Sequence, residues 1–270
     1  MIDHVIVPID GSEYADRALL PAAELARRFD ATLVLLQAVH PDDLDDARKE
    51  LGERASSLGV SGTELVLDPL NGPVGALQEA AEARPRSVVC MTTHGRGGLG
   101  RALFGSVAEE TLREVGVPVV LVGPEFDAEA GRGGTLVVPL DGSHRSESIL
   151  PLVAEWAAVL DVGLWIVSVV DPADAERVRS SGQDLAEEAY AERVAHSLPS
   201  GLSVDWEVLH SADPAHAIVE FAAQRGFPII ALASHGRTGL SRVVVGSVAA
   251  RIVKEHAGLT VVVRTAEVDD

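Results

Sequence analysis

Two short segments in the first half of the chain carry residue types that could bind a phosphate or a nucleoside. A Pro-x-Asp-Gly-Ser segment, residues 8–12, ends an apolar run, and a glycine-rich segment, residues 93–108, places Gly-Ser at the start of a helical pattern. Glycine has no Cβ, so its backbone N–H can approach an anion closely and can adopt positive φ. Gly-Ser at a helix start adds unpaired N–H groups, the positive end of the helix dipole and a hydroxyl. This chemistry suits a phosphate.

Both segments occur twice, and the copies define an internal repeat. HVIVPIDGS at residues 4–12 returns as TLVVPLDGS at 135–143, and THGRGGLGRALFGSVA at 93–108 returns as SHGRTGLSRVVVGSVA at 234–249. The stretch GPEFDAEAGRGG at 123–134 has no apolar periodicity and ends in glycines, as a linker does. The sequence therefore predicts two homologous domains, residues 1–124 and 134–266, joined by a linker at 125–133.

Apolar runs and helical patterns alternate within each copy. Nearly continuous apolar runs are typical of strands covered on both faces. Strand–helix alternation favours parallel pairing, with right-handed crossovers that place helices on both faces of the sheet. Each copy is therefore predicted to be a doubly wound, Rossmann-like α/β domain with a five-stranded parallel sheet. The expected strands are 5–9, 33–39, 64–67, 87–91 and 117–122, then 136–140, 164–170, 204–209, 229–233 and 259–263; the expected helices are 13–29, 42–58, 74–83 and 106–115, then 147–160, 171–198, 215–225 and 248–255.

Charge and composition restrict the class of function. Forty-one acidic residues against 22 basic ones give a net charge of −19, and no Lys/Arg cluster is present, so nucleic acid is not an expected partner. The apolar runs are far shorter than the ~18 residues of a membrane span. The N-terminus carries an acid where a signal peptide would carry a base. The single cysteine, Cys90, can form no intramolecular disulfide. These features predict a cytoplasmic protein with no membrane partner.

Taken together, the motifs resemble the universal stress protein family. The resemblance is carried by P-x-D-G-S, by N-G-P-x-x-A-L and A-D-P-x-x-A-I, and by H-G-R-x-G-L-x5-G-S-V-A, and it covers both halves of the chain except the linker. It implies a tandem member with two adenine-nucleotide-binding domains of the adenine nucleotide alpha hydrolase-like fold and a role in stress response. ATP, ADP or AMP is the implied ligand, and Mg²⁺ is compatible with it. The resemblance also implies contact between the two domains around a pseudo-twofold axis, and it is compatible with a homodimer of whole chains.

The nucleotide loop of this family, G-x2-G-x9-G-[S/T], is matched in both copies except at its first glycine. Thr92 and Ala233 stand at that position. Because threonine is the bulkier residue, the second domain is expected to be the less obstructed, although the Thr92 hydroxyl could donate to a phosphate. The nucleotide contacts that the resemblance implies are Pro8, Ile9, Asp10, Ala38, Met91, Thr92, His94, Gly95, Arg96, Gly105, Ser106 and Val107 in the first domain, and Pro139, Leu140, Asp141, Val169, Leu232, Ala233, His235, Gly236, Arg237, Gly246, Ser247 and Val248 in the second.

Several of these residues also have a purely structural interpretation. Asp10 and Asp141 can cap turns, because Asp-Gly is a common turn pair. Ser106 can cap its helix in a capping box with Glu109, although the second copy has Ala250 at the glutamate position. The histidines of the loop have no second ligand at metal spacing, so no metal site is predicted. The loop arginines could either reach phosphate oxygens or be solvated.

Three classes of function remain open. The first is a nucleotide-binding stress-response protein. The second is an interaction protein of the same fold that binds no nucleotide and acts through dimerisation, which the missing first glycines favour. The third, an ATPase or nucleotidyltransferase, is not expected. The chain has no GxxxxGK[ST], HxGH or SGGxDS motif and no evident nucleophile–base pair.

Overall fold

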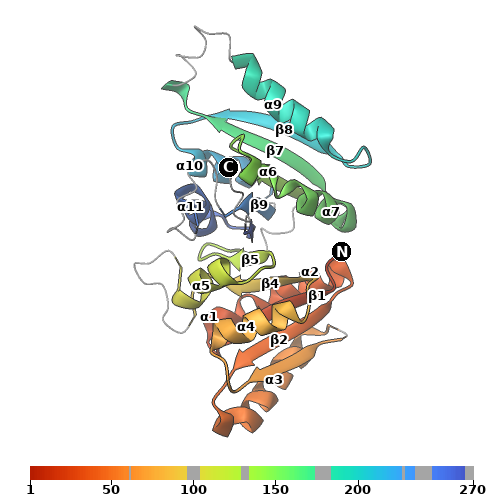
Figure 1. Ribbon diagram of the computed structural model, residues 1–270, viewed down its shortest axis with the longest axis vertical. Coiled ribbons are helices and arrows are strands. Elements are labelled where there is room, and N and C mark those ends of the chain that lie inside the picture. The colour runs from red at the N-terminus through yellow and green to blue at the C-terminus, as the bar shows by residue number, and fades with distance from the viewer. Residues whose placement is uncertain are drawn as a thin grey trace. The chain divides into compact units, whose positions relative to one another are not determined.

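The computed structural model describes residues 1–60, 62–95, 104–128, 134–173, 184–226, 229–234 and 245–264. They belong to two compact units, Met1–Pro124 and Glu125–Asp270, and each unit is an α/β domain (Figure 1). The predicted linker, 125–133, is described only as far as residue 128. Within it, the Asp127 N–H donates to the Ala257 carbonyl of the second unit at 2.9 Å.

The first unit alternates strands and helices as the apolar pattern predicts. Its residues Leu33 to Leu36 are all buried, which explains why that run is continuous rather than alternating. The strands are β1 (His4–Pro8), β2 (Thr32–Ala38), β3 (Glu64–Asp68), β4 (Ser87–Thr92) and β5 (Val119–Val122); the helices are α1 (Glu13–Asp16), α2 (Leu19–Phe29), α3 (Leu44–Leu58), α4 (Pro73–Glu82) and α5 (Ser106–Glu114), with a 3₁₀ turn, η1 (Pro41–Asp43), before α3.

All strands of this first sheet are parallel, in the order β3-β2-β1-β4-β5. Helices α2 and α4 both contact β1, while α2 contacts α3 and α4 contacts α5, so the helices form two layers. The chain turns to one side after β1 and to the other after β3. The winding therefore reverses between β1 and β4, and the carboxyl ends of these two strands define the crevice in which such folds bind ligands.

The second unit repeats this plan. Its sheet is parallel in the order β10-β9-β6-β7-β8, so β6 and β9 take the places of β1 and β4. The strands are β6 (Thr135–Pro139), β7 (Gly163–Val170), β8 (Val204–His210), β9 (Ile229–Ala233) and β10 (Leu259–Val263); the helices described are α6 (His144–Glu147), α7 (Leu150–Leu160), α9 (Asp184–Ser197), α10 (Pro214–Ala223) and α11 (Ser247–Glu255).

In each unit the sequence predicted one helix after the first strand, and the structure has two. The expected span 13–29 divides into α1 and α2, whereas the expected span 147–160 covers α7 and only the last residue of α6. Pro21 has no N–H to donate to the Arg17 carbonyl, and Pro151 has none for the Glu147 carbonyl, so an unbroken helix would lose that bond at each place. The chain instead makes a tight turn, in which the Ala18 N–H donates to the Ala15 carbonyl at 3.1 Å.

Buried residues outside the crevice mostly pack as their types suggest. Trp156 is 1% exposed, and burial raises the pKa of the Cys90 thiol to about 12, so Cys90 is a small core residue rather than a reactive one. Trp206 on β8 is 38% exposed, and its ring packs against that of His196 with centroids 5.6 Å apart. No helix in the described ranges is long and apolar enough to cross a membrane.

Candidate functional site at the carboxyl ends of the strands

The Asp-Gly-Ser segment forms a tight turn that joins β1 to α1. Asp10 Oδ1 accepts hydrogen bonds from the Ser12 N–H at 2.9 Å and from the Ser12 hydroxyl at 2.6 Å. Gly11 has φ of 80°, a value that favours glycine. Ser12 then caps α1 by accepting from the Ala15 N–H at 3.1 Å. The structural interpretation of Asp10 is therefore correct for one of its two carboxylate oxygens.

The turn in the second unit is the same. Asp141 Oδ1 accepts from the Ser143 N–H at 3.0 Å and from the Ser143 hydroxyl at 2.6 Å, and Gly142 has φ of 81°. Ser143 caps α6 by accepting from the Ser146 N–H at 3.2 Å. Asp10 and Asp141 are both half-buried, so each turn holds its carboxylate in place at the end of the central strand.

The first residues of the loop that follows β4, residues 93–95, lie against this turn. A Cβ on Gly95 would overlap Asp10 Oδ2 and would lie 3.5 Å from Asp10 Cγ, so a larger residue would require the carboxylate to move. On the other side, the Ile9 N–H donates to the Leu36 carbonyl at 2.7 Å, and continuing that parallel register brings Asp10 level with Ala38. The fold thus brings Asp10, Gly95 and Ala38 to one edge of the sheet, at the winding reversal.

Thr92 stabilises the start of this loop. Its hydroxyl donates to the His94 carbonyl at 2.5 Å, and the Thr93 hydroxyl lies 3.0 Å from His94 Nδ1. The His94 ring packs edge-on against Tyr14, with centroids 6.3 Å apart. Thr92 is only 5% exposed. The Thr92 hydroxyl, which could have donated to a phosphate, thus donates within the loop; Ala233, its counterpart, is half-buried.

Helix α5 begins at the same edge, and its cap is Gly105. The Gly105 N–H donates to the Thr93 carbonyl at 2.7 Å, and the first helical bond runs from the Glu109 N–H to the Gly105 carbonyl at 2.9 Å. Ser106 is exposed and is the first residue of the helix, so the predicted capping box is wrong. Because the cap residue is glycine, it supplies no side-chain hydrogen bond to the helix. Gly105 has φ of −70°, so it does not use the left-handed region that glycine makes accessible.

Helix α11 begins in the same way. Its cap, Gly246, has φ of −58° and donates its N–H to the Ser234 carbonyl at 3.0 Å. The first helical bond, at 2.9 Å, comes from the Ala250 N–H, and Ser247 and Val248 are exposed. In both helices the N–H groups of the first turn precede the first helical bond and lie beside exposed residues. This is the arrangement that binds anions at helix N-termini.

The remaining predicted site residues divide into those at the crevice, those buried beneath it and those not described. Ala38, Val107 and Val169 are half-buried, as are Pro8 and Pro139, the last residues of β1 and β6. The large apolar residues among the predicted contacts are buried: Ile9, Met91, Leu140 and Leu232. Four predicted residues lie outside the described residues: Arg96, His235, Gly236 and Arg237.

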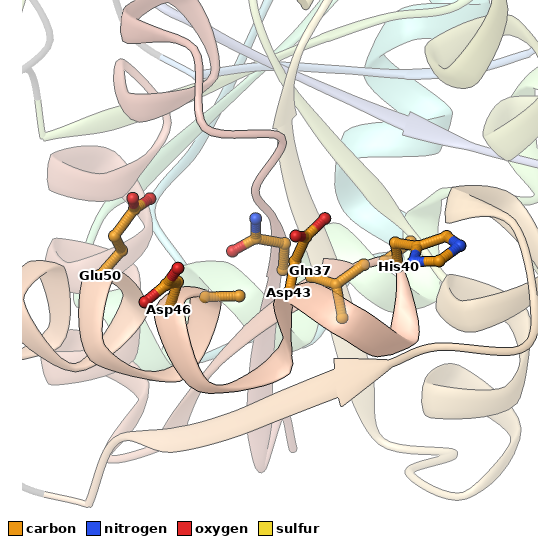
Figure 2. Close-up of a pocket in the computed structure, with 8 residues that line it drawn as sticks. Gln37, His40, Asp43, Asp46 and Glu50 are labelled. Atoms are coloured by element: carbon orange, nitrogen blue, oxygen red, sulfur yellow. The ribbon is translucent and has the colours of Figure 1, made fainter.

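A cavity of about 440 Å³ opens where β2 ends, between the strand and α3 (Figure 2). Sequence reasoning predicted one of its lining residues, Ala38, and missed the others. A polar residue in an otherwise apolar strand, Gln37, was the signal that could have revealed it. The lining is rich in acceptor groups and contains no lysine or arginine: Gln37, Ala38, Val39, His40, Asp43, Asp46, Ala47 and Glu50.

The two units differ in the side chains that lie near α1 and near its counterpart α6. In the first, Asp16 accepts from Arg54 Nε at 3.1 and 3.2 Å. In the second, Tyr190 on α9 lies near the equivalent Glu147; burial raises the pKa of the Tyr190 hydroxyl, and Glu147 and then Asp141 add to that effect. Within the described part of the chain, no group of three or more His, Cys, Asp or Glu side chains is placed to hold a metal ion.

Comparison with known proteins agrees with this geometry. The profile described as "Universal stress protein family" matches residues 1–68, 53–123 and 134–264. The chain belongs to the universal stress protein family. A universal stress protein of Mycolicibacterium smegmatis is 25% identical over 286 residues, covering 96% of each chain, and universal stress protein MJ0531 of Methanocaldococcus jannaschii is 30% identical over 138 residues, covering 44% of this chain and 80% of that one.

Solved structures of universal stress proteins have the same tandem fold. The crystal structure of a universal stress protein from Archaeoglobus fulgidus superposes with a TM-score of 0.68 at 18% identity, over 98% of this chain and 97% of that one. A putative universal stress protein from Pseudomonas aeruginosa gives the same TM-score at 16% identity, over 98% and 94% of the two chains. At these identities the likeness shows the fold.

Proposed function

We propose that each unit binds an adenine nucleotide, ATP, ADP or AMP, and that this universal stress protein acts as a nucleotide-binding regulator rather than as an enzyme. In the first unit the phosphates would lie at the N-terminus of α5, the ribose at Asp10 and the base near Ala38. In the second unit α11, Asp141 and Val169 would take these roles.

The observation that carries the proposal is the glycine cap of α5 and α11. Neither cap needs glycine for its backbone, because φ is −70° at Gly105 and −58° at Gly246. Packing against the described residues does not require it either: a Cβ would lie 3.4 Å from the Thr93 carbonyl oxygen at Gly105 and 3.7 Å from the Ser234 oxygen at Gly246. Serine or aspartate would cap each helix better. Glycine at both places leaves room for an anion to reach the N–H groups.

The spacing of the strands supports the order of the contacts. The sheet places β1 between β2 and β4. Neighbouring strands are about 4.8 Å apart, so the ends of β2 and β4 are separated by about 10 Å. This matches the reach of a nucleotide from its base to its phosphates. A carboxylate at the end of the middle strand, Asp10, is an acceptor for ribose hydroxyls.

The test is whether the purified full chain holds adenine nucleotide. The protein is precipitated with acid, the supernatant is resolved by chromatography, and fresh protein is dialysed to equilibrium against labelled ATP. Released adenine nucleotide, or ATP retained on the protein, supports the proposal. Protein that carries no nucleotide and retains no ATP in dialysis would favour the interaction protein of the same fold.

The substitutions Thr92→Gly and Ala233→Gly are expected to change ATP affinity in opposite directions. Thr92→Gly removes the hydroxyl that bonds the buried His94 carbonyl, so the loop loosens and the first unit should bind ATP several-fold more weakly. Ala233→Gly removes a half-buried methyl beside the crevice, so the second unit should bind ATP more tightly. Calorimetric titration of each variant measures both effects. A gain in affinity from Thr92→Gly would show that the threonine obstructs the ligand after all.

A further inference from the structure

The amide of Gln37 is buried and incompletely bonded. Gln37 is the next-to-last residue of β2, follows a run of apolar residues and is 8% exposed. Its Oε1 has no hydrogen-bond partner among the described residues. A buried acceptor without a partner costs free energy, and such groups are rare in native proteins. Gln37 also lines the cavity at the end of β2, so its amide is placed to meet a ligand (Figure 2).

The groups around this amide accept hydrogen bonds. Asp43, Asp46 and Glu50 on η1 and α3 line the same cavity (Figure 2). His40, also in the lining, is exposed, and its Nδ1 lies 3.4 Å from the carboxylate of Asp42. Three carboxylates without a lysine or arginine repel phosphates and attract N–H groups. The cavity therefore fits the donor-bearing end of a ligand, and a nucleotide would enter it with its base.

The equivalent position in the second unit is also polar and buried. Pro8 pairs with Leu36 and Pro139 pairs with Val167, so the residue after each partner, Gln37 and Ser168, occupies the same place in its sheet. Ser168 is likewise 8% exposed, and its Oγ has no partner among the described residues. Both units thus leave a buried side-chain oxygen unbonded next to the proposed base position.

We infer that Gln37 is a specificity-determining residue of the first unit, and that its Oε1 accepts a hydrogen bond from the 6-amino group of adenine. The inference rests on the proposed function and deepens it by assigning a base to the cavity. Glutamine recognises adenine because its amide matches the amino group and an adjacent ring nitrogen. A 6-oxo purine would set its oxygen against Oε1 and the three carboxylates. Ser168 both donates and accepts, so the second unit discriminates less.

The experiment compares ATP with ITP, in which an oxygen replaces the 6-amino group. The full chain carries Gly246→Val, which confines binding to the first unit, and both affinities are measured by calorimetry with and without Gln37→Leu. In the Gly246→Val chain, ATP is expected to bind at least about tenfold more tightly than ITP. After Gln37→Leu is added, the affinities for ATP and ITP should agree within about twofold. The melting temperature should not fall, because leucine removes an unbonded buried amide.

A matched control is Gln78→Leu, which makes the same change at an exposed position of α4 and should leave the ATP/ITP ratio unaltered. If ATP binds but Gln37→Leu leaves the ratio unchanged, the inference about Gln37 is wrong and the proposed function stands. A loss of both affinities with a lower melting temperature shows a structural role and also contradicts the inference. If neither the Gly246→Val chain nor the unmodified chain binds ATP or ITP, the proposed function fails together with the inference.

Discussion

Valine at both Gly105 and Gly246 is expected to lower ATP affinity at least about a hundredfold, which corresponds to about 2.7 kcal/mol. The added side chains would stand where the phosphates must approach the N–H groups at the helix starts. The fold should survive, because both residues have ordinary φ and a Cβ at either position meets the described residues at no less than 3.4 Å. Isothermal titration of the double variant with ATP measures the loss.

Gly72→Val provides the matched control. Gly72 is also a helix cap without a side-chain bond, at the start of α4, and a Cβ there meets nothing within 4 Å. Its N-terminus does not lie at the winding reversal, so the substitution should leave ATP affinity unchanged while imposing the same penalty on the helix. Unchanged ATP affinity in the Gly105→Val, Gly246→Val variant would show that α5 and α11 do not bind the phosphates.

Alanine at Gly95 is expected to destabilise the first unit by about 1–3 kcal/mol and to weaken its binding of ATP by at least about tenfold. The new methyl would overlap Asp10 Oδ2. The carboxylate would have to move, which would break the two hydrogen bonds from Ser12 that fix the turn. Urea denaturation measures the first effect and calorimetry the second.

Two further variants identify the cause. Gly52→Ala, in the middle of α3 with nothing within 4 Å of the new Cβ, should stabilise the protein by about 1 kcal/mol, the opposite sign. In an Asp10→Ala background, Gly95→Ala should cost much less, because the atom it meets is absent. If the effects of Asp10→Ala and Gly95→Ala on the free energy of unfolding are additive, the new methyl group does not clash with the Asp10 side chain.

The strands were predictable because their chemistry is local. Runs such as Leu33–Leu36 are apolar throughout, and the structure buries all of them. The break in the first helix was harder to predict, because its apolar spacing continues across Arg17 and Ala18; the missing N–H of Pro21 is the feature that ends α1 early. The pseudo-twofold contact between the two domains stays a prediction.

The site was predictable as a set of segments but not as an arrangement. Asp10 was predicted as a nucleotide contact from the family resemblance, and its turn follows from the Asp-Gly pair alone. Its contact with Gly95 depends on β1 and β4 being neighbours, which no local pattern specifies. The cavity at Gln37 depends on how α3 packs on β2. Burial of Thr92 was missed for the same reason, because its partner is a carbonyl in a loop whose path the sequence does not reveal.

The most direct test is the number of ATP molecules bound to one intact chain, counted by native mass spectrometry across a titration with ATP. The account predicts two molecules per chain at saturation, one after Gly105→Val or Gly246→Val alone, and none after both. A chain that stays unliganded at every ATP concentration, or two molecules that remain bound in the double variant, would contradict it.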